Sequence, residues 1–125
     1  MPEITGAFSS FAVPDLDEAR RFYGETLGLQ VGEDEMGFLR LVLPGGHEVV
    51  VYPKPDFEPA SYTVLNLVVG DVEAAVDELG SRGVRFERSE GFRQDDEGIA
   101  RGPQGPPIAW FEDPAGNVLS VLQTT

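Results

Sequence analysis

Few side chains of this chain could carry out chemistry, and they are far apart in the sequence. The single histidine, His47, stands next to Glu48 at the expected start of a strand. Together they could act as an acid/base pair or supply two metal ligands. Adjacent residues of a strand point to opposite faces, however, and a catalytic zinc site takes three protein ligands. We therefore favour a solvated hairpin end for His47.

Two polar residues interrupt strands that are otherwise apolar. Asn66 lies in the run from Val64 to Val69, and Ser10 holds the equivalent place in the run that ends at Val13. A buried polar group needs a hydrogen-bond partner, because leaving it unpaired costs about 1–3 kcal/mol. That partner is either a bound ligand, or a residue of a neighbouring strand or water, and the sequence leaves both open.

Two aromatic residues, Tyr52 and Trp110, fall on expected strands beside the same cavity. They could form the wall of a site for a flat or apolar ligand, or they could pack in the core. The acidic loop 91–98, with Arg93, Gln94 and the three carboxylates at 95–97, could close over a site. We favour a solvated loop, because acid/base catalysis by those carboxylates would need burial and a positioned substrate.

Composition excludes several classes of function. The chain has 125 residues, which is enough for one domain, and a net charge of -13, which argues against a nucleic-acid partner and favours a cationic ligand over an anionic one. It contains no cysteine, so there is neither a disulfide nor a thiolate. No apolar run is long enough to cross a membrane, and the N-terminus does not have the pattern of a signal peptide. We expect a cytoplasmic protein with no membrane partner.

The elements that position these residues are repeated. One amphipathic run begins at the N-cap Asp15 and stops at Gly28; a second begins at Asp71 and stops at Gly83. A short apolar segment precedes each run, and more strand-like sequence follows it. The expected strands are 4–13, 29–31, 37–43, 47–52, 64–69, 84–87, 99–101, 108–112 and 118–122.

This order predicts an α+β fold of two βαβββ modules. Module one spans about 1–53, the proline-rich segment 53–60 is a linker, and module two spans about 61–125. We expect residues 1–125 to form a single domain in which the two modules share a cavity.

Three segments resemble the vicinal oxygen chelate superfamily. They are Val13-Pro14-Asp15-Leu16-Asp17-Glu18-Ala19, Phe22-Tyr23 before Leu27-Gly28-Leu29, and Asp113-Pro114-Ala115-Gly116-Asn117. That group contains glyoxalase I, extradiol dioxygenases, and the bleomycin- and fosfomycin-resistance proteins. The resemblance covers nearly the whole chain. It implies modules whose mixed sheets curl into a cup, in a homodimer.

The resemblance also places a divalent metal at four positions on the wall of the cup. Metal-using members have His or Glu there, whereas this chain has Phe8, Val50, Val64 and Ser120. Phe and Val have no lone pairs, and a neutral hydroxyl is a poor ligand beside His or carboxylate. We expect that the metal site is lost, and with it the family's cofactor.

Three functions remain open. The first is a cup that binds a small organic molecule, cationic or aromatic, without a metal. The second is a metal-dependent lyase, isomerase or dioxygenase with displaced ligands such as His47, Glu48 or Glu112, and the third is a structural dimer with a collapsed cup. We favour the first and assign no catalytic residue. The predicted ligand-binding residues are Phe8, Ser10, Val50, Tyr52, Val64, Asn66, Trp110 and Ser120.

Overall fold

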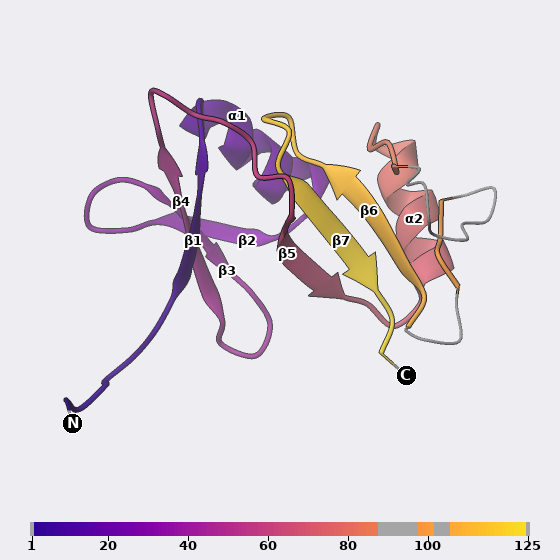
Figure 1. Cartoon of the computed structure of the whole chain (residues 1–125), viewed down its shortest axis with the longest axis horizontal. Coiled ribbons are helices and arrows are strands. Elements are labelled where there is room, and N and C mark those ends of the chain that lie inside the picture. The colour runs from indigo at the N-terminus through magenta and orange to yellow at the C-terminus, as the bar shows by residue number, and fades with distance from the viewer. Residues whose placement is uncertain (1, 88–97, 102–105, 125) are drawn as a thin grey trace. The chain divides into compact units, whose positions relative to one another are not determined.

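The chain folds as two compact units, Met1–Glu58 and Pro59–Thr125, in the computed structural model (Figure 1). The structure describes residues 2–87, 98–101 and 106–124. The boundary between the units falls within the predicted linker, 53–60. A single domain with a shared cavity remains a prediction. None of the described helices is both long and apolar enough to cross a bilayer.

The first unit follows the predicted βαβββ order. Its elements are β1 (Ser9–Val13), α1 (Leu16–Arg21), a π-helical turn η1 (Phe22–Thr26), β2 (Gln30–Glu33), β3 (Leu39–Val42) and β4 (Glu48–Pro53). The strand order is β1-β4-β3-β2, with β1 parallel to β4 and the other pairs antiparallel. The mixed sheet follows from the connections, because hairpins join β2, β3 and β4, whereas a helix joins β1 to β2.

The first strand is shorter than predicted. β1 begins at Ser9 rather than Ile4, because β4 pairs with it from Ser9 to Val13. Residues 2–8 are exposed and lead away from the sheet (Figure 1).

The first helix begins where the sequence predicts it. The Asp15 side chain accepts hydrogen bonds from the backbone N–H groups of Asp17 (2.9 Å) and Glu18 (3.2 Å), which caps α1. The end of the helix differs, because its last turn widens into η1, with a hydrogen bond from Leu27 N–H to the Phe22 carbonyl (2.9 Å).

One face of the first sheet is buried against this helix. Alternate residues of β1, β3 and β4 are buried, and α1 packs on β3 and β4. Tyr23 is fully buried there, and its ring lies 5.8 Å from that of Phe11. We call the opposite face of each sheet, away from its helix, the distal face.

The second unit repeats this arrangement with fewer regular strands. Its elements are β5 (Thr63–Val68), α2 (Val72–Ser81), β6 (Ile108–Glu112) and β7 (Val118–Leu122). The strand order is β5-β7-β6, with β5 parallel to β7 and β6 antiparallel to it. The Asp71 side chain caps α2 by accepting from the Ala74 N–H (3.1 Å), and α2 packs on β6 and β7.

Two strands predicted for the second unit form only single bridges. In place of strand 84–87, one bridge joins Phe86 to Phe111, because the Val84 N–H is already bonded to the Leu79 carbonyl at the end of α2 (3.0 Å). In place of strand 99–101, one bridge joins Ala100 to Ile108. The two prolines at 106–107 lack the N–H groups that would extend this pairing.

The molecule is therefore an α+β protein with two small mixed sheets, each with one helix packed on it. The predicted fold class is confirmed. The bridge at Phe86 completes the same strand order in the second unit as in the first.

Candidate functional site

Three predicted residues share the distal face of the first sheet. Ser10 on β1 is paired with Val50 on β4, and Tyr52 lies two residues after Val50, on the same face. Ser10 is exposed, and Val50 and Tyr52 are half-buried. Val51, which lies between them on β4, faces the core. The sheet thus brings these three side chains together.

The fourth residue predicted in this unit does not belong to the sheet. Phe8 precedes β1 and is 67% exposed. The residue that pairs with Val50 is Ser10, two positions further along the chain.

In the second unit, three predicted residues form a row across the distal face. Ser120 on β7 is paired with Asn66 on β5 and with Trp110 on β6. Ser120 is fully buried, and its Oγ donates a hydrogen bond of 2.6 Å to Oδ1 of Asn66. The expectation that Asn66 is buried is wrong, because its side chain is exposed on β5. Of the two kinds of partner left open for it, the structure provides a residue of a neighbouring strand. Trp110 is half-buried beside them.

Val64 lies at an irregularity of the same sheet. The pairing of β5 with β7 shifts between Thr63 and Leu65, so Val64 has no direct partner in the register. Its side chain is half-buried.

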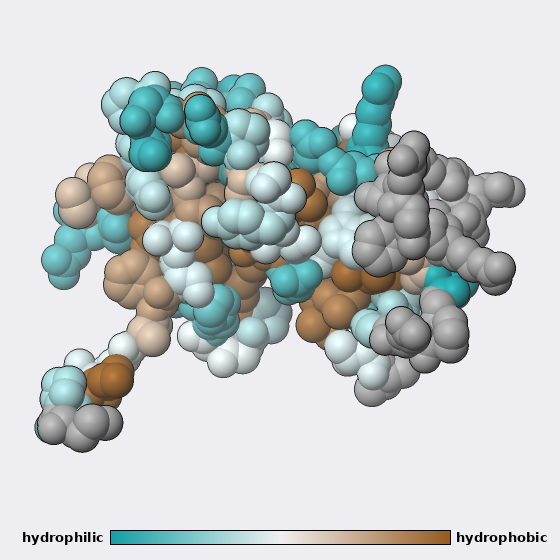
Figure 2. Space-filling model, in the orientation of Figure 1, coloured by the Kyte–Doolittle hydropathy of each residue, from teal (hydrophilic) through white to brown (hydrophobic). Residues whose placement is uncertain are grey.

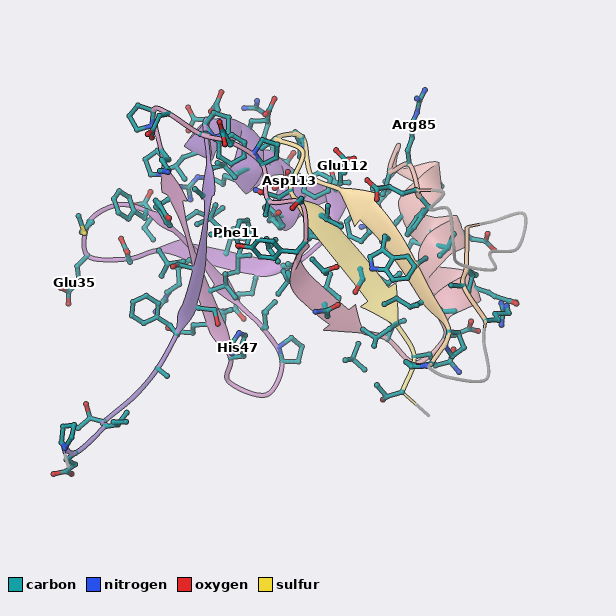
Figure 3. All side chains as sticks on the ribbon, viewed as in Figure 1. Phe11, Glu35, His47, Arg85, Glu112 and Asp113 are labelled. Atoms are coloured by element: carbon teal, nitrogen blue, oxygen red, sulfur yellow. The ribbon has the colours of Figure 1, made fainter. Side chains whose placement is uncertain are left out.

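The displaced ligands suggested for an enzyme come from both units. His47 is exposed at the end of a hairpin (Figure 3), as expected for a solvated position. Glu48 lies 3.4 Å from the guanidinium of Arg40, and Glu112 belongs to the other unit. Among residues 2–87, 98–101 and 106–124, no three His, Asp or Glu side chains are grouped as metal ligands. The loop with Arg93 and Gln94 lies outside the described residues.

Sequence reasoning missed a pair of carboxyl groups next to Trp110. The Glu87 N–H bonds to the Trp110 carbonyl (2.7 Å), which places Glu87 beside β6, near Glu112. A hydrogen bond to Glu112, partial burial and repulsion by that carboxylate raise the pKa of Glu87 to about 7. The positively charged side chain of Arg85, two residues before Glu87, points away from Glu112 (Figure 3). Glu87 therefore keeps its proton to a higher pH than an ordinary glutamate does.

The Asp-Pro-x-Gly-Asn segment is a buried turn of the second unit. Oδ1 of Asp113 accepts from the N–H groups of Ala115 (3.0 Å) and Asn117 (2.9 Å), and Oδ2 accepts from the Asn117 side-chain amide (3.2 Å). Oδ1 of Asn117 in turn accepts from the Ala60 N–H (3.3 Å). These polar side chains stabilise the turn between β6 and β7.

The second unit exposes apolar surface, and the first unit has a hollow. Figure 2 shows brown, apolar surface where β5 and β7 lie, and Val68 on β5 is 64% exposed. In the first unit, a shallow hollow of about 270 Å³ lies beside the ends of β2 and β3. It is lined by Gly28, Leu29, Gln30, Val42, Leu43 and Pro44. This volume is slightly below that of an ordinary ligand pocket.

The chain belongs to the Glyoxalase/Bleomycin resistance protein/Dioxygenase superfamily, whose family model matches residues 7–121. This confirms the resemblance seen in the sequence. None of the curated proteins compared with the sequence matches it.

Solved structures give the same fold. A member of this superfamily from Sphaerobacter thermophilus DSM 20745 is 26% identical, with a TM-score of 0.72; the match covers 94% of this chain and 97% of that one. TnmS3, an antibiotic binding protein from Streptomyces sp. CB03234, is 27% identical, with a TM-score of 0.72 and coverage of 99% and 100%. The fosfomycin resistance protein FosX from Listeria monocytogenes shares the fold at 12% identity, with a TM-score of 0.73 and coverage of 98% and 96%.

Proposed function

We propose that this protein binds a small organic molecule, cationic or aromatic, without the divalent metal used by other members of its superfamily. The observation that carries this proposal is the row of Asn66, Ser120 and Trp110. At the position where the family resemblance implies a metal ligand, the Ser120 hydroxyl is fully buried and donates a hydrogen bond to Oδ1 of Asn66. Its strand neighbour Trp110 offers an aromatic surface.

The residue types around this row suit an aromatic or cationic ligand. Indole rings attract cations through their negative π-face, and Glu112 adds a carboxylate at the end of the same strand. The net charge of -13 attracts cations at long range. The antibiotic binding protein TnmS3 has a similar fold at 27% identity, which supports binding rather than catalysis as the role of this chain.

Titration of the tryptophan fluorescence tests the proposal, because Trp110 is the only tryptophan. We expect a saturable change with benzylammonium or with benzyl alcohol in metal-free buffer. In calorimetry, Trp110→Leu should lower the affinity for that probe at least about tenfold, since stacking and cation–π contacts contribute about 1–2 kcal/mol. Tyr62→Leu is the matched control, because Tyr62 is an aromatic residue of the same unit that is 70% exposed and lies outside β5. Equal losses in both variants would count against the proposed site.

Metal analysis separates this proposal from a displaced-ligand lyase, isomerase or dioxygenase. After equilibration with Zn²⁺, Ni²⁺, Mn²⁺ or Fe²⁺ and dialysis, we expect less than stoichiometric metal by mass spectrometry. Stoichiometric uptake that disappears in His47→Ala would instead support the enzyme.

We also propose that the protein is a homodimer, on the strength of the family resemblance. Light scattering on the purified chain should give about twice its mass of 13.6 kDa. A mass of one chain at micromolar concentration would refute the dimer without affecting the binding proposal.

A further inference from the structure

A positive charge lies in the middle of the first sheet, on its distal face. β3 runs between β4 and β2, and its residue Arg40 is paired with Val50 on one side and with Gly32 on the other. The Arg40 side chain is 41% exposed. An arginine in this position is displayed on the sheet rather than at its rim.

The neighbouring carboxylate does not satisfy this guanidinium. Nη1 of Arg40 lies 3.4 Å from Oε1 of Glu48, which is a long contact between partly exposed groups and contributes little. Nε of Arg40 is covered and has no hydrogen-bond partner among the described residues. An unpaired, covered donor is unfavourable, so an acceptor supplied from outside would be stabilised here.

The side of the guanidinium that carries Nε and Nη2 lies over a residue without a side chain. A Cβ atom on Gly32 would stand 3.6 Å from Nη2 and 3.8 Å from Nε of Arg40. These two N–H groups are parallel, and together they bind a carboxylate in bidentate geometry. Because Nε is covered in this conformation, binding through this edge requires the Arg40 side chain to turn toward the ligand.

Apolar surface adjoins the charge on the same face. Val50 on β4 is paired directly with Arg40, and Val42 lies two residues after Arg40 on β3. Val42 is paired with Gln30, and both line the hollow of about 270 Å³. A ligand with its anionic group at Arg40 would have hydrophobic surface for its body.

We propose that Arg40 forms a carboxylate-binding subsite on the distal face of the first sheet, for a small organic acid whose apolar body lies over Val50 and Val42. This extends the proposed function by giving the ligand an anionic group, and it rests on that function because it assumes that the distal faces bind organic molecules. The net charge of -13 opposes anions at long range, so attraction must come from the guanidinium itself.

The experiment compares sodium benzoate with benzamide, its neutral analogue of similar shape. Backbone amide NMR shifts of Gly32 and Arg40 report binding locally, and calorimetry gives the affinities. We expect benzoate to bind at least about tenfold more tightly than benzamide, with shifts centred on these two residues.

Two variants test the guanidinium in different ways, and a third variant serves as the control. Arg40→Gln removes the charge, whereas Gly32→Ala keeps the charge and covers the Nε–Nη2 edge with a methyl group at ordinary contact distance. Both should weaken benzoate binding about tenfold or more and leave benzamide binding unchanged. Arg82→Gln is the matched control, because Arg82 is also 41% exposed and bonded to a glutamate. It should bind benzoate like the unaltered protein.

The outcomes are distinct. Equal benzoate affinity in Arg40→Gln and the unaltered protein would overturn the subsite, and so would benzoate binding no tighter than benzamide. In either case, a fluorescence response of Trp110 to benzylammonium would leave the proposed function standing. Failure of every organic probe, at both sheets, would overturn the subsite and the proposed function together.

Discussion

Replacement of Glu87 by glutamine should make the stability of the second unit less dependent on pH. Glu87 and Glu112 share a hydrogen bond beside Trp110, and the pKa of Glu87 is raised from its ordinary value of 4.5 to about 7. The folded protein therefore holds a proton between pH 4.5 and 7 that the unfolded chain releases. The stabilisation from this group is present below pH 4.5 and is lost as the pH rises through 7.

The magnitude follows from the size of this pKa change. At about 1.4 kcal/mol for each pH unit, the upper limit is about 3 kcal/mol. Glu87 is only partly buried and Glu112 is exposed, so screening by water reduces the effect to about 1 kcal/mol. The amide of Glu87→Gln resembles the protonated acid and stays neutral at every pH. The variant should match the unaltered protein at pH 5 and be more stable by about 1 kcal/mol at pH 8.

Urea unfolding at pH 5, 6, 7 and 8, followed by the fluorescence of Trp110, measures this difference in the unit that contains the pair. Glu25→Gln is the control, since it removes the same charge from an exposed position in the other unit. Its effect should be the same at pH 5 and pH 8. A stability difference for Glu87→Gln that is also constant across this range, or a variant that is less stable at pH 8, would refute the reasoning.

Four further substitutions test hydrogen bonds and backbone conformation in the second unit. Ser120→Ala should lower the free energy of unfolding by about 1 kcal/mol, because the hydrogen bond from the buried Ser120 hydroxyl to Asn66 is lost; calorimetric unfolding checks this, and an unchanged midpoint would contradict it. Asp113→Ala should destabilise by about 3 kcal/mol in urea unfolding, since three N–H groups of the buried turn lose their acceptor, and a loss below 1 kcal/mol would argue against that role. Gly83→Ala should cost about 1–2 kcal/mol because φ is 93° there, whereas Gly80→Ala, inside α2 and with open space around it, should stabilise by up to about 1 kcal/mol. The same sign for the two glycine variants would be inconsistent with backbone strain.

Local signals in the sequence were enough to predict most of the elements. Asp15 and Asp71 are helix caps because their side chains bond to N–H groups within three residues, and that geometry requires no distant partner. The turn at 113–117 is local in the same way. Strands 84–87 and 99–101 were overpredicted, because strand pairing depends on which N–H groups distant segments leave available.

The candidate site was predictable only in part. Val50 and Tyr52 were both predicted to line the cavity, and they share one face of β4. Asn66 was expected to be buried, but it is exposed on β5. The identity of its partner, Ser120, depends on the register between β5 and β7, which are far apart in the sequence. Phe8 also shows the effect of strand pairing. The predicted strand 4–13 includes Phe8, but β1 pairs with β4 only from Ser9 to Val13, so Phe8 lies outside the sheet.

The sequence by itself determined the family, the repeated helices and the residue types at the positions where the family resemblance implies a metal. The tertiary structure alone decided which polar groups meet: Ser120 with Asn66, Glu87 with Glu112, and Arg40 over Gly32. The physical reason is that composition and caps act over a few residues, whereas the charge and hydrogen bonding of a site depend on register between strands distant in the chain.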